Sequence, residues 1–120
     1  MLITNKHVGN FLLMIQNNDQ KILNLLGLAM RANKLVLGTE PTLSAIKLQK
    51  VGVAFFPSDG GKSQEKKLAD KSNTYGVTLI LNFSREQLVH AIGVNRSVFA
   101  IADRGFSRKI KALILEKERN

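Results

Sequence analysis

The hydrophobic positions along this chain alternate between helical spacing and short continuous runs. From Asp19 to Ala32, apolar side chains recur every three or four residues, a spacing that predicts an amphipathic helix. Asn18 or Asp19 would cap its start, and Asn33 is expected to end it in the left-handed conformation that asparagine tolerates. The apolar run Leu35–Leu37 then predicts a short strand.

A glycine separates this strand from a second helical pattern. Gly38 is followed by Thr39–Gln49, where Thr39 is the expected N-cap because its hydroxyl can accept a hydrogen bond from the first turn. Pro41 falls within that first turn, where its missing N–H costs no helical hydrogen bond. Such a strand-to-helix turn points backbone N–H groups and the positive end of the helix dipole outward, ready for a phosphate or a base edge.

The same alternation continues to the end of the chain. Further apolar runs predict buried strands at Val51–Phe56, Val77–Leu81 and Ser97–Ala102. Further helices are predicted at Gln64–Tyr75, after Ser84 with Gln87 completing a capping box, and from about Gly105 onward. Helices that alternate with short strands predict an α/β layered domain.

The start of the chain differs from the rest. The apolar run Phe11–Ile15 is too short and too weakly flanked for a secretory signal, and no small-residue cleavage site follows it. We interpret residues 1–18 as an N-terminal extension, which is an upstream translation start, an expression remnant or an unstructured arm. Residues 19–120 contain no repeat, low-complexity tract or interdomain linker, so a single domain is expected there.

Charge narrows the class of partner. Eighteen Lys and Arg against nine Asp and Glu give a net charge of +9, which favours a polyanion, usually nucleic acid. The alternative is a basic protein that is merely soluble. Because the basic residues are dispersed and no apolar run approaches the roughly 20 residues of a membrane helix, no membrane partner is expected. The lack of cysteine excludes disulfides and is compatible with a cytoplasmic protein.

Catalytic chemistry has few candidates. His7 lies in the extension and His90 in a predicted helix, no serine stands in a nucleophile-elbow pattern, and the acidic residues lack metal-binding spacing. We therefore expect no enzyme, metal, cofactor or small-molecule substrate. The segment Asp59–Ser63 resembles part of a phosphate-binding P-loop, but that motif needs a glycine where Phe56 stands, so a flexible loop is the better interpretation.

Two loops remain as candidate binding segments. One is the Gly38 turn, and the other is Ala91–Ser97, which contains Arg96. In a layered α/β domain, loops at one edge of the sheet converge although they are distant in sequence. The basic residues expected around the Gly38 turn, as candidate phosphate contacts, are Arg31, Lys34, Lys47 and Lys50. Aromatic residues are few, so base stacking on an exposed sheet is poorly supported.

The order of several motifs resembles a known family. The run ILNLLGLAMRANKLVLG, Ile22–Gly38, is similar to the opening of the bacterial YlxQ-type proteins. These belong to the kink-turn-binding superfamily of the ribosomal proteins L-seven-Ae and L-thirty-e. The similarity continues through Leu88–Val94 and Ile101–Phe106, and it covers roughly residues 20 to 115. No single motif is decisive, but their order and spacing together are fairly specific.

The resemblance implies a three-layer α/β/α sandwich with a mixed, mainly four-stranded sheet. It also implies binding to kink-turn RNA, a bent duplex with sheared G·A pairs beside a bulge. In the family, a G-x-N-E-x-x-K signature at the start of the second helix contacts the G·A pairs, and a later loop packs against the bulged nucleotides. The implied RNA-binding residues are Gly38, Thr39, Glu40, Pro41 and Ser44, joined by Lys47, and in the later loop Val94, Asn95, Arg96, Ser97 and Val98.

Three positions depart from that signature. Glu40 stands where the family has asparagine, Pro41 where it has glutamate, and Ser44 where it has lysine. A glutamate accepts a hydrogen bond from a base amino group but cannot also donate one. Pro41 removes an N–H from the binding end of the helix, and Ser44 removes a cation. Lys47, one turn along the same helix, could partly replace that charge.

The sequence thus favours a non-enzymatic RNA-binding protein whose expected partners are ribosomal or other kink-turn RNA and the ribosome. A protein-interaction adaptor on the same fold, with weak and non-specific RNA affinity, is the alternative. An RNA-modifying or nucleotide-hydrolysing enzyme is the weakest hypothesis, because the chain has neither a cofactor fingerprint nor a base–nucleophile pair.

Overall fold

The computed structural model describes residues 18–119 of the 120-residue chain. Residues 1–17 of the expected N-terminal extension lie outside the described residues. Asn18 and Asp19, one of which was expected to cap the first helix, are both helical where the described residues begin. Within residues 18–119, no helix combines the length and the apolar composition that a membrane span needs.

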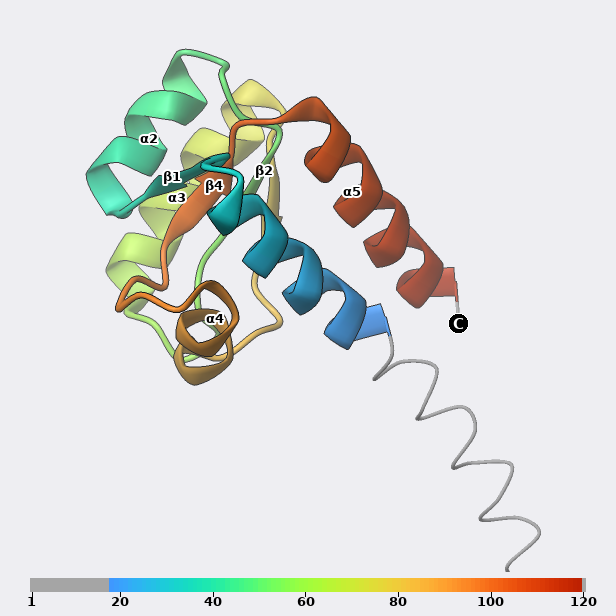
Figure 1. Ribbon diagram of the computed structural model, residues 1–120. Coiled ribbons are helices and arrows are strands. Elements are labelled where there is room, and N and C mark those ends of the chain that lie inside the picture. Colours follow the sequence, from blue (N-terminus) through green and yellow to red (C-terminus); the bar gives the residue numbers. More distant parts are fainter. Residues whose placement is uncertain (1–17, 120) are drawn as a thin grey trace, which may run out of the picture.

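Helices and short strands alternate along the chain as the hydrophobic pattern predicts (Figure 1). A leading helix, described over residues 18–31, is followed by β1 (Leu35–Leu37), α2 (Thr39–Lys47), β2 (Val53–Phe55), α3 (Lys62–Tyr75), β3 (Thr78–Ile80), α4 (Arg85–Ile92), β4 (Phe99–Ile101) and α5 (Arg104–Arg119). The paired strands are shorter than the apolar runs around them. Residues at the ends of those runs, such as Val51 and Phe56, are buried without belonging to a strand.

The four strands form one mixed sheet in the order β1-β4-β2-β3. β4 runs antiparallel to both of its neighbours, whereas β2 and β3 are parallel. The chain therefore places β4, the last strand, in the interior of the sheet. Because β4 runs antiparallel beside β1, the segment before β4 and the turn after β1 lie at the same end of the sheet.

Two apolar cores hold helices against the two faces of this sheet (Figure 1). On one face, α2 and α3 pack Ile46 and Leu68 against Ala54 and Ala100. On the other face, the leading helix, α4 and α5 cover a core that contains Phe55 and Phe99, whose rings stack with their centroids 5.3 Å apart. The predicted three-layer α/β/α sandwich with a mixed four-stranded sheet is confirmed.

The helix ends show which local predictions are right. Asn33 adopts the expected left-handed conformation with φ 60°. The predicted capping box is present, since Ser84 Oγ accepts from the Gln87 N–H and the Gln87 side chain accepts from the Ser84 N–H. The prediction of Thr39 as an N-cap is wrong, because Gly38 occupies that position and no side chain caps α2.

The second helix also ends earlier than the pattern predicts. α2 stops at Lys47, and Gln49 turns the chain with φ 57°. The N–H of Lys50 then donates to the carbonyl of Ala45, which closes the helix end in a Schellman arrangement. Glutamine is not a usual residue for this left-handed position, so the sequence carried no signal for it.

The capping box makes the stability of α4 testable. We expect Ser84→Ala to lower the free energy of unfolding by about 1 kcal/mol, because a donor of the first turn loses its partner. Ser63→Ala is a matched control, since Ser63 is exposed in the first turn of α3 and that helix has no side-chain cap. Urea denaturation of both variants measures the difference, and equal losses would contradict a capping role for Ser84.

Candidate nucleic-acid interface

The Gly38 turn joins β1 directly to α2. Gly38 has φ 101° and ψ 158°, a region of backbone conformation that is essentially restricted to glycine. A Cβ added there would also lie 3.4 Å from Cδ of Pro41. The Gly38 carbonyl accepts from the Thr42 N–H, which begins the α2 hydrogen-bond ladder immediately after the strand. Only a glycine lets the helix start this abruptly.

The same glycine ties the turn to the second predicted loop. The N–H of Gly38 donates to the carbonyl of Val98 over 2.8 Å. Val98 directly precedes β4, and β4 pairs with β1 from Phe99 opposite Leu37 onward. This hydrogen bond therefore continues the β1–β4 ladder by one step and sets the start of α2 beside the 94–98 loop.

The start of α2 offers few but well-placed donors. With the Gly38 N–H used by Val98, the helix geometry leaves the N–H groups of Thr39 and Glu40 without an intrahelical acceptor. Pro41 supplies no N–H. Glu40 is exposed in the first turn, where its carboxylate lies at the positive end of the helix. A ligand at this point meets two backbone donors and one carboxylate acceptor.

The 94–98 loop has exposed polar residues at its tip and buried residues where it joins β4. Gly93 ends α4 with φ 80°, and the Arg96 N–H donates to the Val94 carbonyl over 2.8 Å, which makes a tight turn. Ser97 and Val98 are buried, whereas Asn95 and Arg96 are exposed. The exposed residues are therefore held at the tip by the anchored ones.

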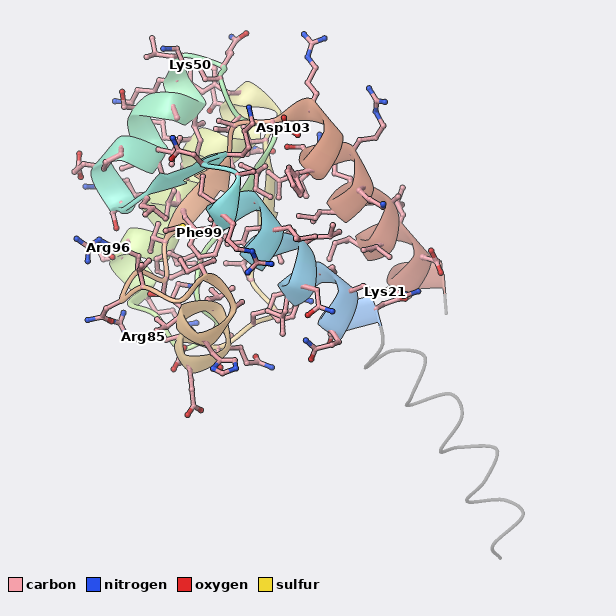
Figure 2. All side chains as sticks on the ribbon, viewed as in Figure 1. Lys21, Lys50, Arg85, Arg96, Phe99 and Asp103 are labelled. Atoms are coloured by element: carbon pink, nitrogen blue, oxygen red, sulfur yellow. The ribbon has the colours of Figure 1, made fainter. Side chains whose placement is uncertain are left out.

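Arg85, which the sequence analysis did not single out, braces this loop. Its guanidinium donates from Nη1 to Ser97 Oγ over 2.9 Å and from Nη2 to Asn95 Oδ1 over 3.0 Å. The backbone N–H of the same residue donates to Asp59 Oδ1 over 2.9 Å. Arg85 thus connects the 94–98 loop with the loop after β2. Figure 2 shows Arg85 and Arg96 together at one end of the molecule.

The two predicted loops enclose one groove of about 370 Å³, which we call the loop groove. Its lining includes Gly38 and Thr39 from the turn, Arg85, and Asn95, Arg96, Ser97 and Val98 from the later loop, with Phe56, Pro57, Gly60, Gly61 and Gln64 completing it. The segment that imitates a P-loop therefore contributes to the groove. A Cβ at Gly60 would come within 2.5 Å of the Phe56 ring, so this glycine is required by packing.

A second groove, of about 390 Å³, runs between α2 and α3. We call it the helix groove, and it is lined by Glu40, Leu43, Ser44, Lys47, Lys67 and Lys71. Lys67 and Lys71 were not predicted as site residues, although their spacing of four places them on one face of α3. Glu40 lies at the start of α2, so the helix groove begins where the loop groove ends.

Three predicted phosphate contacts lie elsewhere. Arg31 lines a cavity between the leading helix and α4, and Lys50 lines a cavity beside the start of α5. Lys34 precedes β1 at the end opposite to Gly38, and its carbonyl accepts from the Ala102 N–H. None of the three lines the loop groove or the helix groove. The prediction that these three residues lie around the Gly38 turn is therefore wrong. Their contact with phosphate stays a prediction.

The cations of the two grooves form no ion pair with the acids of the described side chains. Over residues 20–116, the ion pairs are Lys62–Glu65 and Lys66–Asp70, both along α3. Lys47, Lys67 and Lys71 have no ion-pair partner in that part of the chain. The Arg96 guanidinium donates to a neutral acceptor, the Asn95 carbonyl. The same described region contains no cluster of three His, Asp or Glu side chains that could hold a metal ion. The lysines and arginines of the grooves therefore keep their charge available to an anion.

The chain belongs to the ribosomal protein L7Ae/L30e/S12e/Gadd45 family, whose model matches residues 20–111. Within the family, it is similar to the RNA-binding protein YlxQ of Enterococcus faecium, with 43% identity over 84% of this chain and 98% of the relative. It is also 35% identical to the RNA-binding protein YlxQ of Bacillus subtilis (strain 168), over 75% of this chain and 91% of that protein.

Solved structures confirm the fold. A protein of unknown function from Bacillus halodurans C superposes with a TM-score of 0.75 and 41% identity, over 78% of this chain and 96% of that one. The Giardia lamblia 15.5kD RNA binding protein superposes with a TM-score of 0.71, over 86% of this chain and 89% of that one. Because its sequence identity is only 17%, this second likeness shows the shared fold alone.

The glycine requirement at the turn can be tested directly. We expect Gly38→Ala to lower the free energy of unfolding by about 1–3 kcal/mol, because alanine is strained in this backbone region. Gly61→Ala is the matched control from the same groove, since Gly61 has φ −69° and an added Cβ would meet no atom within 4 Å. Urea denaturation compares the two variants. A Gly38→Ala variant as stable as the Gly61→Ala variant would contradict the assigned constraint.

Proposed function

We propose that this protein binds structured RNA of the kink-turn type, without catalysis, through the loop groove and the adjoining helix groove. The observation that carries the proposal is the Gly38–Val98 hydrogen bond, because it holds the start of α2 and the 94–98 loop on one surface. The two relatives that bear the name RNA-binding protein support RNA as the ligand. The proposed setting is the cytoplasm, in a ribosomal or other ribonucleoprotein assembly.

A bent duplex suits a surface made of two separate parts. The resemblance assigns the G·A pairs to the helix start and the bulged nucleotides to the later loop. In this protein the helix start offers the N–H groups of Thr39 and Glu40, and the later loop offers Asn95 and Arg96. A straight duplex has no bulged nucleotide for the loop. Structure-specific binding is therefore expected to need both parts at once.

The departures from the family signature change how the contacts are made. The Glu40 carboxylate can accept from a guanine amino group, which keeps one of the two hydrogen bonds that an asparagine would make. Ser44 provides no cation, but Lys47, Lys67 and Lys71 line the same helix groove. Phosphate attraction is therefore supplied by three lysines on two helices instead of one lysine in the signature.

The proposal predicts discrimination between two RNA shapes. At physiological salt, the protein is expected to bind a kink-turn RNA at least tenfold more tightly than a fully paired duplex of equal length. Fluorescence anisotropy with both RNAs measures this ratio. Equal affinities would contradict structure-specific recognition, because phosphate attraction alone does not distinguish the two shapes.

The loop contact makes a second prediction about salt. Replacing Arg96 by alanine removes one phosphate-seeking cation, so the slope of log affinity against log salt is expected to fall by about one. Lys21→Ala is the matched control, because Lys21 is exposed on the leading helix and lies away from Arg96 in Figure 2. An unchanged slope for the Arg96 variant, or an equal change for both, would argue against a phosphate contact in the loop.

A further inference from the structure

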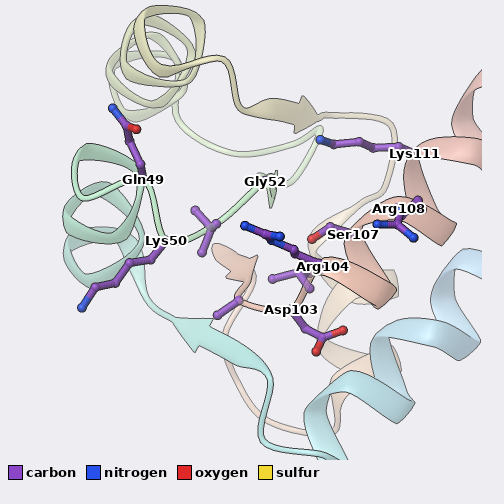
Figure 3. A pocket seen from close by; sticks show the side chains of 11 residues that line it. Gln49, Lys50, Gly52, Asp103, Arg104, Ser107, Arg108 and Lys111 are labelled. Atoms are coloured by element: carbon purple, nitrogen blue, oxygen red, sulfur yellow. The ribbon is translucent and has the colours of Figure 1, made fainter.

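A cavity of about 430 Å³ lies at the end of the sheet opposite to the loop groove. Gly52 precedes β2 and Ile101 ends β4, and both line this cavity, whereas Phe56 after β2 and Val98 before β4 line the loop groove. The strands therefore separate the two sites. We call this cavity the α5 cavity. Figure 3 shows it between the turn after α2 and the first turns of α5.

The α5 cavity is lined by cations and by a hydroxyl. Arg104 and Lys111 extend their charged ends over the cavity, and an added Cβ at Gly52 would lie 3.4 Å from Nζ of Lys111 (Figure 3). Ser107 is only 6% exposed, and its Oγ lies 3.8 Å from the position that a Cβ added at Gly52 would take. Among residues 20–116, neither cation forms an ion pair with an acid.

The acidic residue that lines the cavity, Asp103, already accepts a hydrogen bond from the backbone. Asp103 Oδ2 accepts from the Phe106 N–H over 2.9 Å, so this carboxylate caps the start of α5. Figure 3 shows its side chain directed away from Arg104 and Lys111. The first N–H groups of α5, on Arg104 and Gly105, keep no intrahelical acceptor. Cations and a hydroxyl thus line the cavity, and the carboxylate that also lines it, that of Asp103, is engaged by the α5 backbone.

We propose that the α5 cavity binds a backbone phosphate of a second RNA segment, so that the protein holds RNA at both ends of its sheet. This inference rests on the proposed function only in taking RNA as the ligand. A free nucleotide would offer the same phosphate chemistry. However, the residues that line the cavity include no aromatic side chain on which a lone base could stack. Lys50 and Arg108 stand on opposite sides of it in Figure 3 and add positive charge at its two margins.

The test follows the amide NMR signals of the full chain during titration with a uridine hexamer, and separately with uridine monophosphate. The hexamer is expected to shift the signals of Gly52, Gly105 and Ser107 in a saturable manner. The double variant Arg104→Gln/Lys111→Gln is expected to weaken this site about tenfold, because two charged donors to phosphate are lost. The control Lys21→Gln/Lys109→Gln removes the same charge from exposed positions outside the cavity, one of them on α5 itself.

Equal weakening by both double variants, or shifts spread over the whole basic surface, would overturn the proposal. Binding of the monophosphate as tightly as the hexamer would overturn the assignment to an RNA chain. Ser107→Ala, which removes only the hydroxyl, is expected to weaken the site by a smaller factor and covers the case of a misfolded double variant. If the protein fails to prefer a kink-turn RNA but keeps the hexamer shifts, the proposed function falls and this inference stands.

Discussion

The backbone conformation of Gly38 is the constraint on which the rest of this surface depends. Its φ of 101° and ψ of 158° let α2 begin one residue after β1, and its N–H reaches the Val98 carbonyl over 2.8 Å. Any other residue would be strained there, so the chain would need a longer turn and the helix start would move away from the 94–98 loop. The geometry of the candidate interface therefore follows from one glycine and one hydrogen bond.

The strand order extends this local constraint to the whole molecule. Because β4 lies between β1 and β2, the loop before it meets both the Gly38 turn and the segment after β2. The strands are only three residues long, so about 10 Å of sheet separates the loop groove from the α5 cavity. Cations without ion-pair partners line both ends in the described part of the chain. A small sheet thus has a separate group of basic side chains at each of its two ends.

Local patterns predicted the elements better than they predicted the neighbours of each side chain. Apolar spacing and the Gly38 break sufficed for the layered fold and for the meeting of two loops at one sheet end. Arg85 could not be found in this way, because its hydrogen bonds reach Asn95 and Ser97, ten and twelve residues away. Lys34 and Lys50 were placed too close to Gly38, since three strand residues and the length of α2 carry them to the other end of the sheet. Position in sequence is a poor guide to distance across a sheet.

We infer that the helix start and the 94–98 loop contact the same RNA. Ultraviolet crosslinking of the full chain to a kink-turn RNA, followed by mass spectrometry of the crosslinked peptides, tests it most directly. We expect crosslinks in the peptide that contains Gly38–Glu40 and in the peptide that contains Asn95–Ser97, within one complex. Crosslinks to only one of these peptides, or only to peptides at the opposite end of the sheet, would contradict it.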